Sequence, residues 1–218
     1  MPFCRQYKIG DTELLLWHVT EIAEEMARFV SPVCVAECAG FVSERRRCEW
    51  LAVRALLAMR FGDGVRVVYD GAGKPALDGV SYDVSISHTA GYVVLALSGS
   101  GAVGVDVELL SRNALVASER YIPSNVLDSF PLEMKNTKAL FHWCAKEALF
   151  KLVGNLGGTF RENISLGDFE IACNGSFRVS VVGLGADVNE DFIADYMCDG
   201  ELLFVVCRRC KACLCDDK

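Results

Sequence analysis

The sequence predicts an α+β protein. Two segments, 41–61 and 132–153, have the apolar spacing and end signals of long helices, and short β-prone segments follow each of them. A glycine-rich turn over 98–101 joins two further β-prone segments, 92–97 and 103–108, which predicts an antiparallel pair. These features favour small, mostly antiparallel sheets packed against long helices.

The composition excludes several classes of protein. At 218 residues with 52% apolar content, the chain can form one large domain or two small ones with a proper core. A formal charge of −7 argues against nucleic-acid binding, and it requires any anionic ligand to be held by a local cluster of Lys and Arg. No apolar run is long enough to cross a membrane, and the first 20 residues lack a secretory pattern, so we expect a cytoplasmic protein with reduced thiols.

The first long helix, 41–61, carries a cluster of arginines. Ser43 suits its N-cap and Gly62 its C-terminal stop. Arginines on a helix usually form a solvated face, but in an acidic protein they are also a candidate anion site. These arginines are Arg45, Arg46, Arg47 and Arg54. Before the helix we expect a strand over 14–19, a helix over 21–29 and a turn at 31–32.

The segment after this helix ends in polar groups. A strand over 65–69 leads into a turn over 70–75, whose glycines allow a close approach of the backbone to a ligand and whose tip carries Lys74. The next strand, 83–88, ends at His88 between two hydroxyl side chains. His88 is therefore either a satisfied structural group or a polar ligand contact.

The hexapeptide 103–108 places two carboxylates in an apolar strand. Side chains alternate along a strand, so Asp106 and Glu108 project to one side while Val105 and Val107 project to the other. Neighbouring carboxylates repel each other and resist burial. The strand is either a solvated edge or a site that binds a cation.

The second long helix, 132–153, starts after Pro131 and is closed by Gly154. It carries Lys146, Glu147 and Lys151. Glu147 and Lys151 are four residues apart, so the simplest interpretation is an intrahelical ion pair worth roughly 0.3–0.5 kcal/mol. Around this helix we expect a helix or loop over 112–128, broken by Pro123, a loop over 154–158, and strands over 164–171, 177–182 and 202–207.

The chain has eleven cysteines. Seven are scattered in apolar surroundings, as small core residues are. The others, Cys207, Cys210, Cys213 and Cys215, form one compact cluster beside basic residues. Structural zinc sites usually combine two separated pairs, so this cluster matches one only weakly, and a terminal peculiarity without a metal is the alternative.

Four of these motifs, in this order, resemble the signature of the 4′-phosphopantetheinyl transferases. They are Gly73-Lys74-Pro75, the strand Val84 to Thr89, the acidic strand Val103 to Glu108, and Trp143 to Lys151 with its Lys-Glu and following Lys. The pair formed by the last two is the specific part. The resemblance spans residues 31–153 and is to the monomeric, two-lobed type, of which the surfactin-synthetase activator is the prototype.

The resemblance implies a reaction. The phosphopantetheine arm of coenzyme A is transferred to a serine of an acyl or peptidyl carrier protein, and adenosine 3′,5′-bisphosphate is released. Mg²⁺ would be held by Asp106, Glu108 and Glu147, with Glu147 also the expected general base. Lys146 and Lys151 would face the pyrophosphate or support the carboxylates.

The resemblance also implies coenzyme A contacts, with Arg45 at the 3′-phosphate and Arg46 as its substitute. The full set is Arg45, Arg46, Gly73, Lys74, Pro75, Ser87 and His88. The chain departs from the prototype in two places. Residues 31–38 lack basic side chains, and 121–126 lack an acidic residue.

The implied fold has two similar lobes, 1–108 and 109–218, packed tightly with coenzyme A between them. The acidic strand would lie at the join, and the helix of the other lobe would supply the third carboxylate. Arg112 and Arg120 are candidates to contact the carrier protein. Two alternatives stay open: a coenzyme A-binding protein without transferase activity, and a Mg²⁺-dependent hydrolase of nucleotide pyrophosphates.

Overall fold

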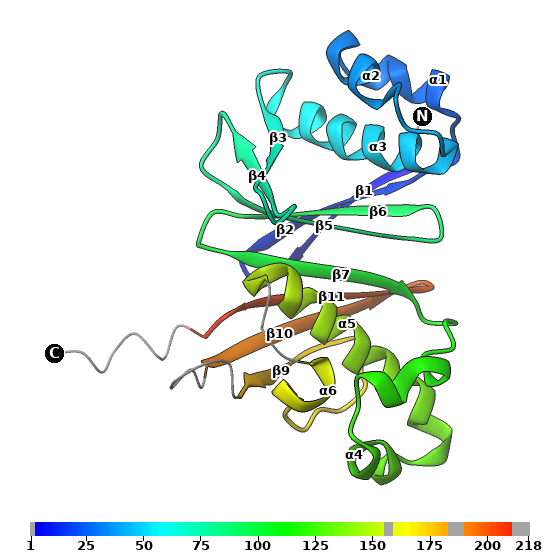
Figure 1. Ribbon diagram of the computed structural model, residues 1–218, viewed down its shortest axis with the longest axis vertical. Helices are drawn as coiled ribbons and strands as arrows, with labels where there is room; N and C mark the ends of the chain where they lie inside the picture. The colour runs from blue at the N-terminus through cyan, green and yellow to red at the C-terminus, as the bar shows by residue number, and fades with distance from the viewer. Residues whose placement is uncertain (1–2, 155–158, 183–189, 211–218) are drawn as a thin grey trace, which may run out of the picture. The chain divides into compact units, whose positions relative to one another are not determined.

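The computed structural model describes residues 3–154, 159–182 and 190–210. The chain divides into two compact units, Met1–Gly101 and Ala102–Lys218. Each unit contains an antiparallel sheet and one long helix (Figure 1). The predicted α+β class, with small antiparallel sheets packed against long helices, is confirmed.

The first unit is built on a four-stranded antiparallel sheet of order β1-β2-β6-β5. A separate two-stranded hairpin, β3-β4, flanks it. The strands are β1 (Phe3–Ile9), β2 (Thr12–His18), β3 (Arg66–Tyr69), β4 (Pro75–Asp78), β5 (Asp83–Thr89) and β6 (Tyr92–Ser98). The helices are α1 (Ala23–Met26), the 3₁₀ turn η1 (Ala27–Phe29), α2 (Pro32–Cys38) and α3 (Glu44–Phe61).

Helix α3 has the ends that its sequence predicts. The Ser43 side chain accepts a hydrogen bond from the backbone N–H of Arg46, as an N-cap does. Gly62 ends the helix at φ 78°, a conformation that favours glycine. The buried side of α3, including Leu51, Ala55 and Leu56, packs on β2 and β6 and forms the core of this unit.

The second unit is a five-stranded antiparallel sheet of order β7-β11-β10-β9-β8. Its strands are β7 (Val103–Leu109), β8 (Ile164–Leu166), β9 (Asn174–Val181), β10 (Glu190–Asp199) and β11 (Leu202–Arg209). Its helices are η2 (Leu115–Arg120), α4 (Ser124–Ser129), η3 (Leu132–Met134), α5 (Lys135–Val153) and α6 (Phe160–Asn163).

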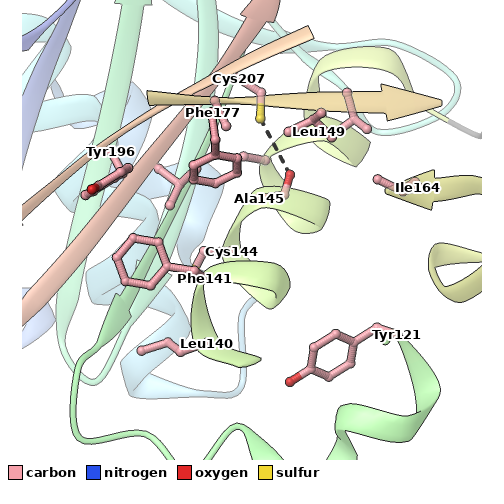
Figure 2. Close-up of a cluster of buried hydrophobic side chains, with 14 of the residues drawn as sticks. Tyr121, Leu140, Phe141, Cys144, Ala145, Leu149, Ile164, Phe177, Tyr196 and Cys207 are labelled. Carbon is pink, nitrogen blue, oxygen red and sulfur yellow. Dashed lines mark hydrogen bonds between the residues drawn. The ribbon is translucent and has the colours of Figure 1, made fainter. Parts of the chain in front are cut away.

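Helix α5 packs against β7 and β11 (Figure 1). Figure 2 shows the apolar cluster on its buried side, where Phe141 lies near Tyr196 and Phe177. The thiol of Cys207 donates to the carbonyl of Ala145 at 3.5 Å, which ties β11 to the helix (Figure 2). This packing fixes the orientation of Glu147 and Lys151 on α5 relative to β7.

The structure corrects the expected pairing of the acidic strand. We predicted that 92–97 and 103–108 form a hairpin, but β6 pairs with β2 and β5, while β7 pairs with β11. A short glycine-rich connection favours a hairpin locally, but β2 and β5 occupy both edges of β6, and β7 pairs with the apolar strand β11. The acidic strand therefore belongs to the second unit, in contrast to the expected boundary near residue 108.

Several elements were not predicted. They are β1, β4, β10 and the helices α6 and α2. We interpreted Pro32 as part of a turn, but it occupies the first turn of α2. The expected strand 164–171 is shorter, and the helix expected to start at Leu132 begins with a 3₁₀ turn. None of the described helices is long and apolar enough to span a bilayer.

Candidate functional site

Gly104 determines which side of β7 faces α5. A Cβ atom built on Gly104 would overlap the carbonyl oxygen of Ala148 and lie 2.8 Å from the amide nitrogen of Leu152. Position 104 therefore points at the helix backbone, and only glycine permits this close approach. Because side chains two apart share a face, Asp106 and Glu108 also point to the α5 side of the strand.

Asp106 is buried on this face, with 5% of its surface exposed. The ammonium of Lys151, from α5, donates to Asp106 Oδ1 at 2.8 Å and to the carbonyl of Val105 at 3.0 Å. Burial, together with the neighbouring Asp106 carboxylate, raises the pKa of the Cys144 thiol. Lys151 thus ties the buried carboxylate of Asp106 to α5.

Glu108 is paired with a different cation. Its carboxylate forms an ion pair with the guanidinium of Arg112, which lies just after the strand. The Arg112 guanidinium also lies over the ring of Trp143, 5.0 Å from its centroid, and Trp143 contacts Tyr121 edge to face. Arg112, expected as a carrier-protein contact, is therefore part of the acidic face.

Glu147, on α5, is near enough to Asp106 to be influenced by its charge. Burial raises the pKa of Glu147, and the negative charge of Asp106 raises it further, while Lys151 and Arg112 act in the opposite direction. All three expected metal ligands are therefore contained in the second unit. The third carboxylate comes from α5 of the same unit as the strand, and not from another lobe as we expected.

The donor chemistry of these three carboxylates fits Mg²⁺, which prefers a few carboxylate oxygens together with water and phosphate oxygens. Their arrangement is different, because within residues 3–154, 159–182 and 190–210 no group of three or more His, Cys, Asp or Glu is placed to hold a metal ion. Asp106 and Glu108 instead contact Lys151 and Arg112. The proposed metal ligands stay a prediction.

Lys146 is buried and bonded to the backbone, which indicates a structural role. It is 1% exposed, and its ammonium donates to the carbonyl oxygens of Tyr121 at 2.6 Å, Phe160 at 2.5 Å and Ile164 at 2.7 Å. Burial lowers the pKa of Lys146 to about 7, although a group that satisfies three acceptors gains from carrying three N–H donors. This geometry does not support the expected contact between Lys146 and a pyrophosphate.

In the first unit, two expected coenzyme A contacts meet at one carboxylate. Glu49 Oε1 accepts from Arg45 Nε at 2.7 Å and lies 3.5 Å from His88 Nδ1. Glu49 is largely buried, whereas Arg45 and His88 are exposed, so the carboxylate lies beneath the two basic groups. Arg45 on α3 and His88 on β5 are thereby brought to one surface.

The turn before β4 has the conformation that its sequence suggests. Asp70 accepts from the amides of Ala72 and Lys74 at 2.9 and 2.8 Å, and Gly73 adopts φ 81°. These bonds hold Lys74 at the turn. Pro75 begins β4, and Ser87 is buried, 4% exposed. The roles of Gly73, Lys74, Pro75 and Ser87 towards coenzyme A stay predictions.

The remaining arginines of α3 have partners within the unit. Arg47 pairs with Glu44 at 2.6 Å, and Arg46 lies 5.2 Å from the ring centroid of Phe41. Arg54 was expected on the polar face, but it is buried and stacks 3.5 Å from the ring centroid of Trp50. The aliphatic and planar parts of an arginine can cover apolar surface, so the charge pattern alone misplaces it.

The cysteine cluster divides between core and tail. Cys207 is completely buried in β11, and burial raises the pKa of its thiol well above the ordinary value. Cys210 follows the strand, and Cys213 and Cys215 lie outside the described residues. Cys207 is therefore a core residue, and the expected alternatives for the tail stay open.

Three residues of these sites were not identified from the sequence, and a fourth, Arg112, was expected at the carrier-protein surface and not beside Glu108. Glu49 gave no signal beyond an ordinary helix charge. Gly104 and Cys144 lie inside the motifs, and their spacing could have indicated a close strand–helix contact. The contacts of Gly104 with Ala148 and of Asp106 with Cys144 join residues about 40 positions apart, so only tertiary packing reveals them.

Comparison with known proteins gives a partial similarity. No family model matches the chain. Part of it is similar to two curated proteins named 4′-phosphopantetheinyl transferase AcpT, from Salmonella typhi and Salmonella typhimurium. Each is 38% identical over 66 residues, which is 30% of this chain and 34% of the relative. The matched segment thus spans about a third of the length of these relatives.

Proposed function

We propose that the protein transfers the 4′-phosphopantetheine arm of coenzyme A to a serine of an acyl or peptidyl carrier protein, with Mg²⁺, and releases adenosine 3′,5′-bisphosphate. The observation that carries the proposal is the face shared by β7 and α5, where Asp106, Glu108, Glu147 and Lys151 gather in one unit. The partial similarity to proteins named as such transferases supports the same activity.

Glu147 is the proposed general base. The attacking serine hydroxyl must lose a proton as its oxygen bonds to the phosphorus, and a carboxylate with a raised pKa is better matched to that task than an ordinary one. Glu147 is half-buried beside Asp106, which accounts for the shift. Lys151 lies beside the same carboxylates, and its ammonium is the proposed partner of the pyrophosphate charge.

The carboxylates Asp106, Glu108 and Glu147 would hold the metal. When bound, Mg²⁺ neutralises charge on pyrophosphate oxygens and so favours departure of the bisphosphate. Lys146 contributes differently in this proposal. Its three carbonyl bonds hold α5 to the segments around Tyr121 and Ile164, and so keep the neighbouring Glu147 in place.

The basic groups of the first unit are the proposed binding residues for the nucleotide part of coenzyme A. Arg45 and His88 share the Glu49 carboxylate and are exposed, which suits an anionic ligand such as the 3′-phosphate. Lys74 at the turn, with Arg46 beside Phe41, completes the proposed set. A monomer in the cytoplasm remains the expected setting.

Mass spectrometry of a carrier protein tests the transfer. After incubation with coenzyme A and Mg²⁺, we expect one phosphopantetheine mass on the carrier, and no addition with the Glu147→Gln variant. The absence of any shift across a panel of acyl and peptidyl carriers would contradict the proposal. Release of bisphosphate without a carrier would indicate a hydrolase of nucleotide pyrophosphates. Binding of coenzyme A in calorimetry without any turnover would indicate a coenzyme A-binding protein without transferase activity.

A second measurement tests the nucleotide contacts. Arg45→Ala is expected to raise the KM for coenzyme A with a smaller change in kcat, because it removes a group that binds the 3′-phosphate, which takes no part in the bond changes. Arg66→Ala, an exposed arginine on β3, is the matched control. An unchanged KM for Arg45→Ala would move the 3′-phosphate contact elsewhere.

A further inference from the structure

Two side chains of the protein itself neutralise the acidic face of β7, and they are held differently. Lys151 projects from the middle of the long helix α5, and its ammonium is fixed by a second bond, to the carbonyl of Val105 at 3.0 Å. Its side chain is 27% exposed. Lys151 is therefore a built-in part of the strand–helix contact.

Arg112 is held more loosely. It follows β7 at a turn in which its backbone N–H donates to the carbonyl of Leu109 at 3.0 Å. Its side chain is 42% exposed, whereas its partner Glu108 is only 10% exposed at the side chain. The ion pair thus joins a nearly buried carboxylate to a guanidinium that reaches it from the solvent side.

Arg112 also has a second favourable contact. Its guanidinium carbon lies 5.0 Å from the ring centroid of Trp143, and Tyr121 supports that ring at a centroid distance of 5.3 Å. A cation over an aromatic face is stabilised without any carboxylate. The guanidinium therefore has a stabilising contact besides its ion pair with Glu108.

We propose that Arg112 is an internal counter-ion that competes with a divalent cation for Glu108 and thereby lowers the metal affinity of the site. The inference rests on the proposed function, because it takes Glu108 as a metal ligand. A carboxylate oxygen bonded to a guanidinium must give up that bond before it coordinates a metal ion. Metal binding is consequently less favourable by the free energy of the Arg112–Glu108 ion pair.

Titration of the full-length, coenzyme A-free protein with Mn²⁺, followed by electron paramagnetic resonance of the free ion, tests this competition. We expect Arg112→Gln to bind Mn²⁺ about two- to fivefold more tightly than wild type, the range that a partly exposed ion pair is worth. Arg112→Lys, which keeps the charge, should stay near wild type. Arg120→Gln removes the same charge from the neighbouring 3₁₀ turn and should leave the affinity unchanged.

Thermal unfolding supplies an independent readout. Arg112→Gln leaves a nearly buried carboxylate without this cation, so we expect a lower Tm than wild type and a larger rise in Tm on adding Mn²⁺. An Arg112→Gln variant with unchanged or weaker Mn²⁺ binding and no larger Tm rise would overturn the inference.

Glu108→Gln separates this failure from that of the proposed metal site. If it weakens Mn²⁺ binding while Arg112→Gln does not strengthen it, the metal ligand is retained and only the counter-ion role is refuted. If Glu108→Gln leaves Mn²⁺ binding unchanged, or if no Mn²⁺ binds, both the ligand assignment and the counter-ion role fail. Transfer to a carrier protein is measured separately and is not used in this test.

Discussion

Gly104 and Ala148 are packed so closely that a single methyl group at position 104 would overlap the Ala148 carbonyl oxygen. This contact sets the spacing between β7 and α5, and with it the positions of Asp106 and Lys151 relative to each other. The glycine of the acidic strand is thus a structural requirement of the candidate site.

Gly104→Ala is expected to destabilise the protein by about 3 kcal/mol or more, because backbone of a long helix must move to admit the methyl group. Denaturant unfolding measures the change. Gly40→Ala is the matched control, since a Cβ there meets nothing within 4 Å and Gly40 has no positive φ. Equal stability of the two variants would contradict the close packing.

Lys146→Met should cost about 2–4 kcal/mol of stability, because it leaves three carbonyl oxygens in the protein interior without their donor. Lys135→Met, on the same helix, is the control, since Lys135 contacts the exposed Asp128. A pyrophosphate contact would give the opposite pattern: unchanged unfolding and a loss confined to kcat or KM. Chemical denaturation and steady-state kinetics on both variants distinguish these roles.

Glu147→Gln is expected to raise the Tm slightly at pH 7. The gain in the free energy of unfolding should be under about 1 kcal/mol, the scale of one partly exposed charge pair. The pKa of Glu147 is raised by burial and by Asp106, so the folded protein binds more protons than the unfolded chain just above pH 4.5. Stability from this group therefore falls as the pH rises through that window, and the neutral amide avoids the loss.

The gain from Glu147→Gln should vanish below about pH 4, where the carboxyl is protonated in both states. Glu133→Gln, an exposed glutamate before α5, is the control and should show no such dependence. Calorimetric scans between about pH 3 and pH 8 provide the measurement. A lower Tm for Glu147→Gln at pH 7 would show that the charged carboxylate stabilises the fold.

The burial of His142 predicts that the fold is sensitive to acid. Its ring is 5% exposed and packs between Phe130 and Phe169, with centroid distances of 5.3 and 6.2 Å. Burial, followed by the charges of Lys146 and Lys138, lowers the pKa of His142 to about 3 from its ordinary 6.5. The folded protein therefore keeps a neutral imidazole at pH values where the unfolded chain takes up a proton.

This difference in proton uptake should lower the free energy of unfolding by about 1.4 kcal/mol for each pH unit between pH 6.5 and pH 3. Above pH 6.5 it should have no effect. Urea unfolding of wild type and His142→Gln at pH 7, 6 and 5 measures it, and the variant should lose less stability on acidification. Identical slopes for wild type and His142→Gln would refute the prediction.

Local patterns in the sequence were sufficient for much of the fold. The Ser43 cap and the Gly62 stop predicted α3, because both act within one helical turn. Strand alternation placed Asp106 and Glu108 on one face. The pairing of β7 with β11 was missed, since these strands are far apart in the chain and the nearby turn gave a misleading local signal.

Charge patterns were less informative than spacing. Arg54 and Lys146 carry charges that suggest exposed or ligand-binding groups, yet both are buried by contacts with Trp50 and with three carbonyl oxygens. Arg112 was assigned to a partner surface but pairs with Glu108. Whether a charged side chain faces solvent depends on partners supplied by distant segments. Composition and periodicity carry no information about which segments those are.

Residues that share a strand face or a helix turn can be identified from the sequence alone, because those relationships repeat every two or every three to four residues. Asp106 and Glu108 are related in this way, and so are Glu147 and Lys151. That these two pairs meet in one unit follows only from the folded protein, because the close approach of α5 to Gly104 depends on packing between segments distant in the chain.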